Sequence, residues 1–278
     1  MARSSSATRS KKASFAVKML FVLIALAILM PGIPIIIYSV SHRWLWPDVL
    51  PSRFTLDKWA YVFSPVSQVM PALVNSLIIG LLVSVISAII GLPAAKVMGQ
   101  RKFRGKAALE MLFLSPLIIP ETAVGLGVLV VFIKLGLANT MLGVIVSHLI
   151  PATPYMIRML SAVFEGYDSN YEVQARSLGA SPLKVFWYVT LPIIRPGLVA
   201  AFLFVFLISL NNFVYSYLVG GGLVITLPLV VFNYASHGGM DLAVASAASI
   251  ILTAPCIALL VISERFIKEE YLSLGMSR

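Results

Sequence analysis

The chain has 278 residues, of which 59% are hydrophobic and only 12% are charged. A soluble core of this size could not hide so much apolar surface, so the composition excludes a soluble domain and indicates an integral membrane protein. The net charge of +10 does not indicate nucleic-acid binding, because the basic residues stand in short clusters beside apolar runs, as topology signals do.

Six apolar stretches are long enough to cross a bilayer as helices, which takes about 20 residues. None shows the period-two alternation of a barrel strand, so the sequence predicts an all-α, polytopic membrane protein with six transmembrane helices. We expect a transmembrane domain over 15–267, between a disordered basic cytoplasmic tail at 1–14 and a cytoplasmic tail at 268–278. The expected spans are about 15–40, 71–98, 107–134, 136–160, 196–219 and 242–264.

The first span follows a basic, Ser-rich start that resembles the beginning of a signal peptide. Its apolar run continues well past the small residues Ala25 and Ala27, which favours an uncleaved anchor. The segment 41–70, which follows it, is expected to lie outside the cytoplasm. Its Trp44, Trp46 and Trp59 indicate either short helices at the lipid headgroups or an ordinary aromatic belt.

Two polar residues stand inside the third and fourth spans. Glu121 is the one acid deep in a span, and it is either a carboxylate of a solute pathway or an internal cap beside Pro116 and Pro120. His148 is expected to form a hydrogen bond between helices rather than to bind a metal.

The loop 163–195 is polar and helix-coded, unlike the spans around it. Tyr171 to Leu178 suits a short helix, with Glu172 four residues before Arg176 for an ion pair and Gly179 as its stop. Ser181-Pro182 is a helix start, and this second helix is expected to end before Pro192. Such a helix pair is either an interfacial anchor or a coupling element that docks on a partner protein.

The fifth span carries the densest polar cluster of the chain, with Asn211 and Asn212 close to Tyr215. The segment 220–241 is too polar and too broken for a seventh span, and is expected to re-enter or cap the outer mouth. Cys256 lies in an apolar run and is expected to be a small buried hydrophobe.

The basic residues set the orientation of the spans. Seventeen of the 21 Lys and Arg residues fall in segments on one side if the N-terminus is cytoplasmic, and only Arg43, Arg53, Lys58 and Lys134 fall on the other. Both termini and the loop 163–195 are therefore predicted to be cytoplasmic.

The loop resembles the cytoplasmic loop of bacterial ATP-binding-cassette (ABC) importer permeases, which carries Glu-Ala-Ala, three residues, Gly, nine residues, an aliphatic residue, one residue and Leu-Pro. Val173 and Gln174 replace the family's Glu and first Ala, and a glutamate stands one position earlier at Glu172. The residues that match in register are Ala175, Gly179, Ala180, Ser181, Val189, Leu191, Pro192, Pro196 and Gly197.

The resemblance extends over about 54–267 and is greatest to the shorter permease of spermidine/putrescine-type importers, although sugar-importer permeases share much of the pattern. Pro120-Glu121 and Thr226-Leu-Pro228 favour the polyamine-like branch, which includes relatives for phosphonates, opines and ferric iron. Other matching positions are Phe54-Thr-Leu56, Asn75-Ser76, Phe103-Arg-Gly105, Gly125, Leu135-Gly136 and Pro154-Tyr155.

The resemblance implies a type I ABC importer permease in the bacterial inner membrane. It also implies as partners a cytoplasmic ATPase dimer, a second permease subunit, expected to be a different chain, an extracytoplasmic solute-binding protein, and membrane lipid around the spans. The chain itself is expected to be no enzyme and to need no cofactor or metal, since it has no phosphate-binding loop. The residues expected to couple it to the ATPase are Glu172, Ala175, Arg176, Gly179, Ala180, Ser181, Leu191 and Pro192.

The expected solute pathway consists of Glu121, Asn211, Asn212 and Tyr215. Polyamine permeases often have acids where the two asparagines stand, and neutral amides suit a zwitterion, an aminophosphonate or a sugar-like solute equally well. The resemblance to the polyamine-like branch leads us to expect a small amino-containing cargo such as a polyamine, an aminophosphonate or an opine. The alternatives are a sugar importer permease, a stand-alone channel or a membrane-embedded enzyme.

Overall fold

The structure is a computed structural model of the whole chain, and it describes residues 4–42, 44, 48–236 and 241–273, with side chains from 17 to 261 apart from 117. Trp46 therefore lies outside the described residues. Within the described ranges the regular elements are helical, and one isolated antiparallel bridge joins Ser41 to Phe54. The helices are α1 (Ser4–Leu29), α2 (Gly32–Ser39), α3 (Asp57–Val62), η1 (Pro65–Ser67), α4 (Val69–Gln100), α5 (Lys106–Ile118), α6 (Glu121–Leu135), α7 (Met141–Glu165), α8 (Asn170–Ser177), α9 (Pro182–Val185), η2 (Phe186–Thr190), α10 (Leu191–Leu210), α11 (Val214–Gly220), α12 (Leu227–Ser236) and α13 (Leu242–Ser273).

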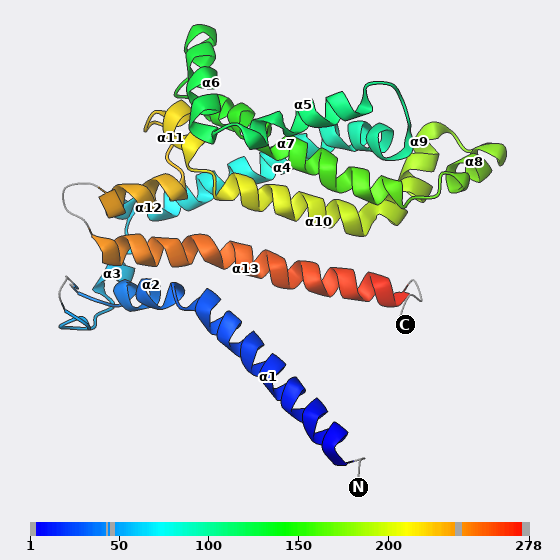
Figure 1. Cartoon of the computed structure of the whole chain (residues 1–278). Coiled ribbons are helices and arrows are strands. Elements are labelled where there is room, and N and C mark those ends of the chain that lie inside the picture. The colour runs from blue at the N-terminus through cyan, green and yellow to red at the C-terminus, as the bar shows by residue number, and fades with distance from the viewer. Residues whose placement is uncertain (1–3, 43, 45–47, 237–240, 274–278) are drawn as a thin grey trace.

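Three helices form the centre of the molecule: α7 packs along α4, and α10 packs against both (Figure 1). Their facing sides bury a core that includes Val83, Met156, Leu160 and Val205. The backbones of α4 and α7 approach closely, because a Cβ at Gly99 would lie only 2.6 Å from the Ser161 carbonyl oxygen. Helices α4, α7 and α10 form the scaffold to which the loop 163–195 is attached.

A second group of helices lies at the opposite end from α8 and α9 (Figure 1). There α13 packs against α2, α3 and α12, around a smaller core that includes Val69, Leu227 and Val244. Lys58 of α3 forms an ion pair with Asp241, and the hydroxyls of Tyr61 and Tyr234 hydrogen-bond. The segment 41–70 thus contains a short helix, α3, as in one of its two alternatives, and this helix is tied to α12 and to the start of α13.

Three described helices are individually long and apolar enough to cross a membrane, and two bent pairs raise the total to five. The three are Val69–Gln100, Pro182–Leu210 and Leu242–Val261. The pairs are Val17–Leu29 with Gly32–Ser39, bent by 45°, and Lys106–Pro116 with Glu121–Leu135, bent by 87°. The helix α12 is short, as expected for a segment that is not a seventh span.

The third predicted span, 107–134, is not one continuous helix. Proline disfavours helical backbone at the residue before it, and Ile119, before Pro120, is extended with ψ of 139°. The fifth predicted span, 196–219, is also broken, since α10 ends at Leu210 and α11 begins at Val214. Both helix breaks matter for function, because each places polar groups inside an apolar span.

The outer helices extend beyond the predicted limits. Helix α1 begins at Ser4, within the expected disordered tail, and α13 continues to Ser273. Neither extension contains proline or glycine, and the extension of α13 is rich in Arg, Lys and Glu, which are good helix formers. Figure 1 shows α1 starting and α13 ending towards the end of the molecule that carries α8 and α9.

Candidate functional site

The loop 163–195 folds as the predicted helix pair. Helix α8 starts where the Asp168 carboxylate accepts a hydrogen bond from the Asn170 amide at 2.9 Å. The predicted ion pair is present, with Arg176 Nη2 lying 3.8 Å from Glu172 Oε2. The local signals of the sequence therefore specify this helix.

Gly179 ends α8 in the left-handed region, with φ of +85°. The Gly179 amide donates to the Arg176 carbonyl at 2.9 Å, and the Ala180 amide donates to the Ala175 carbonyl at 3.1 Å. This pair of bonds is the Schellman arrangement, which satisfies the last carbonyls of a helix. Nothing lies within 4 Å of a Cβ placed at Gly179, so the backbone angle and not the available space favours glycine.

Helix α9 starts as predicted, with Ser181 Oγ accepting from the Lys184 amide at 3.4 Å and Pro182 in the first turn. The prediction that this helix ends before Pro192 is wrong. The chain passes through the π-helix η2 directly into α10, where Leu191 donates to the Phe186 carbonyl and Pro192 lies in the first turn. The wider π turn allows a proline to follow without ending the helix, because its missing N–H is tolerated there.

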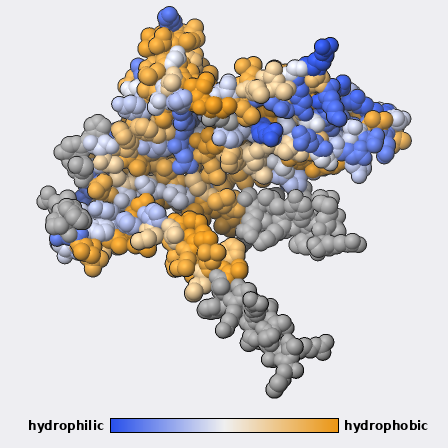
Figure 2. All heavy atoms as spheres, viewed as in Figure 1, coloured by the Kyte–Doolittle hydropathy of each residue, from blue (hydrophilic) through white to orange (hydrophobic). Residues whose placement is uncertain are grey.

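Figure 2 shows hydrophilic side chains gathered over the end of the molecule formed by α8 and α9. Large apolar side chains nevertheless project from this helix pair, and Leu178 beside the turn is 89% exposed. The other exposed apolar residues of the pair and of η2 are Tyr171, Val173, Leu183, Trp187 and Tyr188. A polar surface with a few exposed apolar side chains at a rigid turn is suited to contact with a partner.

Glu172 points away from this exposed surface and is only 7% exposed. Lys96 of α4 places its Nζ 2.6 Å from Glu172 Oε1 and 2.7 Å from Oε2. The Thr190 hydroxyl of η2 donates to Oε1 at 2.8 Å. One carboxylate thus joins α4, α8 and η2.

Electrostatics favour the ionised form of Glu172. Burial alone would raise the pKa of Glu172, but the hydrogen bonds from Lys96 and Thr190 and the charge of Lys96 outweigh it, so that this pKa lies below its usual value. Burial raises the pKa of the neighbouring Tyr167, and the negative charge of Glu172 acts in the same direction. The side chain that joins α4, α8 and η2 is therefore held as a carboxylate.

The second candidate site is a cavity of about 610 Å³ between the two broken spans. Its walls come from the α5–α6 break, the α10–α11 break and the middle of α7. The lining residues are Pro116, Ile118, Ile119, Pro120, Glu121, Pro151, Tyr155, Ile208, Asn211, Asn212, Phe213, Val214 and Tyr215. All four residues predicted for a solute pathway therefore line one cavity.

Within the cavity, Glu121 and Asn212 are bonded to each other. Asn212 donates from Nδ2 to Glu121 Oε1 at 2.5 Å, and its Oδ1 accepts from the Tyr215 amide at 3.1 Å. Asn212 thus holds the start of α11 and presents Glu121 to the cavity at the same time. Asn211 is exposed, and its Nδ2 donates to the Leu207 carbonyl at 2.9 Å.

The buried His148 of α7 bridges the break between α10 and α11. Its Nδ1 lies 2.8 Å from Ser209 Oγ at the end of α10, and its Nε2 lies 3.1 Å from Ser216 Oγ in α11. The Ser216 hydroxyl donates to the Asn212 carbonyl at 2.9 Å. This confirms the prediction of a histidine that hydrogen-bonds between helices.

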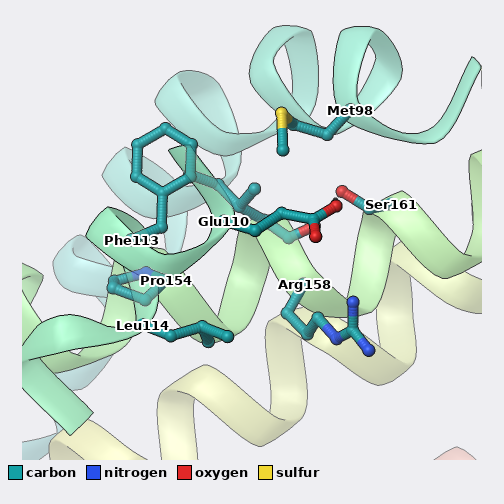
Figure 3. Close-up of a pocket in the computed structure, with 8 residues that line it drawn as sticks. Met98, Glu110, Phe113, Leu114, Pro154, Arg158 and Ser161 are labelled. Carbon is teal, nitrogen blue, oxygen red and sulfur yellow. Dashed lines mark hydrogen bonds between the residues drawn. The ribbon is translucent and has the colours of Figure 1, made fainter. Parts of the chain in front are cut away.

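A smaller pocket lies between α4, α5 and α7 (Figure 3). Glu110 and Ser161 point toward one another there, among Met98, Phe113 and other apolar side chains. Its volume of about 20 Å³ is room for little more than a water molecule, so it is too small for a solute pathway. Among the residues that the structure describes, no three His, Cys, Asp or Glu side chains come together as metal ligands.

Sequence reasoning missed three contributors. Lys96 counted only as a topology signal, Tyr155 counted only as a position that matches the family, and Thr190 carried no signal. Lys96 is an isolated cation near the end of an apolar run, which could have suggested a partner, but Glu172 is 76 residues away. Cys256, expected to be buried, is half-buried, with its Sγ 3.8 Å from Asn211 Nδ2.

The family model described as "Binding-protein-dependent transport system inner membrane component" matches residues 32–269. The chain belongs to this family: it is an inner-membrane permease component of an ABC importer and not the catalytic subunit.

Individual relatives differ in the cargo that their names state. The chain is 33% identical over 176 residues to the putrescine transport system permease protein PotI of Escherichia coli K12. The matched region covers 61% of this chain and 63% of PotI. It is 29% identical over 241 residues to the putative 2-aminoethylphosphonate transport system permease protein PhnV of Salmonella paratyphi A, covering 86% of this chain and 89% of that one. It is 30% identical over 209 residues to the molybdenum transport system permease protein ModB of Mycobacterium bovis, covering 70% and 75%.

Among solved structures, the chain resembles one from a bacterial ABC transporter that imports the acidic polysaccharide alginate. The TM-score is 0.73 at 17% identity, covering 93% of this chain and 97% of the other. This similarity shows that the chain has the helical fold of ABC importer permeases.

Proposed function

We propose that this chain is half of the membrane pathway of a type I ABC importer, and that its cargo is a small amino-containing solute. In this proposal the chain pairs with a second, different permease subunit. An ATPase dimer contacts α8 and α9 from the cytoplasm, and a solute-binding protein delivers the cargo outside. The observation that carries the cargo assignment is the position of Glu121 in the cavity.

The proposed transmembrane arrangement has six spans, with α7 as the sixth beside the three long helices and two bent pairs. Helix α7 has 25 residues and is about 37 Å long, which exceeds the roughly 30 Å thickness of a bilayer core. It is less apolar than the other spans because it carries Ser147, His148 and Arg158. A central helix tolerates such residues because its neighbours can hydrogen-bond them.

Charge complementarity supports an amino-containing cargo. Glu121 is the only charged side chain among the described residues that line the cavity, and its hydrogen-bond partner Asn212 is neutral. A carboxylate with no cation beside it attracts an ammonium group and repels an oxyanion. This favours cargo of the kinds named for PotI and PhnV over the molybdenum named for ModB, and over an acidic sugar.

The helix pair α8–α9 supports coupling to an ATPase. A rigid Schellman turn presents Leu178 next to the polar residues Arg176 and Ser181, and η2 joins α9 to α10 without a flexible linker. Movement of the pair would therefore be passed to the spans as rigid-body motion. An interfacial anchor, the alternative interpretation, would not need a continuous helical connection into α10.

The cargo is tested by uptake into proteoliposomes that contain the complete complex. Glu121→Gln keeps the size of the side chain and can still accept from Asn212, but removes the charge. We expect wild-type uptake of putrescine or 2-aminoethylphosphonate, lowered at least about tenfold by the substitution, with Glu110→Gln as the matched control outside this cavity. Uptake of molybdate or an oligosaccharide, unaffected by Glu121→Gln, would contradict the assignment.

Coupling is tested in the same complex with Gly179→Pro. Proline fixes φ near −65°, which is incompatible with +85° at this position, so the turn must change. We expect ATP hydrolysis to lose its stimulation by the binding protein while the two permeases stay assembled. If no ATPase associates with the wild-type permeases, the helix pair is an interfacial anchor.

A further inference from the structure

Glu172 lies on the proposed coupling helix but is the one charged residue of α8 that is turned inward. Its side chain is 9% exposed, whereas that of Arg176 on the same helix is 57% exposed. Both carboxylate oxygens are occupied, by Lys96 on both and by Thr190 on Oε1. A carboxylate satisfied in this way within the chain has little capacity left for an ATPase.

The partners of Glu172 come from two separate parts of the membrane domain. Lys96 lies one turn before the end of α4, the helix that packs along α7 and against α10. Thr190 is the last residue of η2 and is itself buried, directly before α10. Apart from these contacts, α8 packs against α9 and η2 and is joined to the spans by the backbone at Gly166–Ser169 and at the Gly179 turn.

We propose that Lys96 and Thr190 are positioning residues that clamp Glu172, so that α8 moves as one body with α4 and α10. Glu172 then acts within the chain and not as a contact to the ATPase. This inference rests on the proposed coupling to an ATPase but not on the identity of the cargo. It assigns a mechanical role to the one glutamate of the loop that stands out of register with the family motif.

The clamp is tested by the distance between α8 and the end of α4 in the complete complex, held in lipid nanodiscs. Spin labels are placed at the exposed Val173 on α8 and at the exposed Arg101 after α4, with Cys256→Ser to remove the native thiol. Double electron–electron resonance then gives the distance distribution without nucleotide and with ATP trapped by vanadate. Retention of the ATPase on affinity-purified permease is measured on the same samples.

The variants are Lys96→Gln and Glu172→Gln, each with a matched control. Lys102→Gln removes an exposed cation just beyond α4, and Glu165→Gln removes an exposed acid at the end of α7. We expect one narrow distance in the wild type and both controls, the same in the two nucleotide states. Both clamp variants lose this single narrow peak to a similar extent while the ATPase remains bound.

A charge exchange separates pairing from general destabilisation. Lys96→Glu and Glu172→Lys alone should each abolish the narrow distance, and the double exchange should restore it at least in part, because a pair of opposite charges is re-formed. A double exchange that is as broad as the single variants would argue against a specific pair.

Two outcomes would overturn the clamp. If Lys96→Gln leaves the distance narrow, the backbone and the packing of α8 against α9 and η2 hold the helix without the clamp. If Glu172→Gln releases the ATPase while Lys96→Gln does not, Glu172 contacts the ATPase directly. A wild-type complex that retains no ATPase would instead contradict the proposed function. The distance measurement would still decide whether Lys96 and Glu172 hold α8.

Discussion

Two glutamates occupy the functional regions of this permease, and their surroundings are opposite. Glu172, on α8, is buried and bonded to the Lys96 side chain and the Thr190 hydroxyl. Glu121, in the cavity between the broken spans, is bonded to a neutral amide and open on one side. The first negative charge is compensated by the protein, and the second is left available to a ligand.

This difference follows from the cost of a charge in a medium of low dielectric constant. A buried ion is tolerated when a counter-ion and hydrogen bonds replace the lost water, and removing one partner then leaves an uncompensated charge. A carboxylate at the wall of a hydrated cavity keeps part of its water and can exchange it for a cationic group. Glu172 is therefore expected to affect the fold and motion of the protein, and Glu121 to affect its binding of solute.

The largest effect on stability is expected from Lys96→Met. The substitution leaves the buried Glu172 with only the more distant, exposed Arg176 as a counter-ion, which costs about 3 kcal/mol, the low end of the range for buried pairs because the Lys96 side chain is itself 33% exposed. Asn212→Ala, the equivalent loss at Glu121, should cost less because that carboxylate remains in contact with the cavity. Thermal unfolding of the purified complex measures both, and equal losses would remove the distinction between the two glutamates.

His148→Leu tests the framework behind Glu121. The change removes two hydrogen bonds and leaves the Ser209 hydroxyl buried without this partner, which costs about 2 kcal/mol. Because Ser216 also bonds the Asn212 carbonyl, loosening the α10–α11 break should lower solute uptake as well. Ser161→Ala is a suitable control, since its hydroxyl bonds only within α7. A His148→Leu permease with wild-type uptake would show that the break holds its shape without the imidazole.

The sequence predicted elements whose determinants are local. Caps and a glycine at Gly179 specify α8 and the start of α9, and uninterrupted apolar runs specify α4 and α13. It also predicted that Glu121, Asn211, Asn212 and Tyr215 belong together, from the cost of polar groups inside spans.

What could not be predicted depends on packing between distant segments. The sequence contains no signal that pairs Lys96 with Glu172, which lies 76 residues away. The residues near Pro192 likewise do not predict the π turn η2, through which the chain passes directly into α10. The break at Pro120 was one of the two alternatives that the sequence offered for Glu121. The α10–α11 break was missed, because apolar composition alone does not distinguish a straight helix from a broken one.

A smaller effect is expected from Thr190→Val, which keeps the shape of the side chain and removes one hydrogen bond to Glu172. The cost should be about 1 kcal/mol, because Lys96 still compensates the charge. Thermal unfolding of Thr190→Val, Lys96→Gln and the double variant gives their coupling energy. Strictly additive losses would mean that the lysine and the threonine do not act on the same carboxylate.

The smallest effect is expected in the pH dependence of the stability that Glu172 contributes. The pKa of Glu172 in the folded chain is lowered from 4.5, so its contribution to stability is fully present above pH 4.5 and is lost as the pH falls through the lower, folded value. Other carboxylates titrate in the same window, so the informative quantity is the difference in melting temperature between wild type and Glu172→Gln, followed from pH 7 to well below pH 4.5. This difference should shrink as the pH falls below 4.5, because protonation of the wild-type carboxyl removes the same charge as the substitution. A constant difference for Glu172→Gln would show that ionisation of this carboxyl does not stabilise the protein.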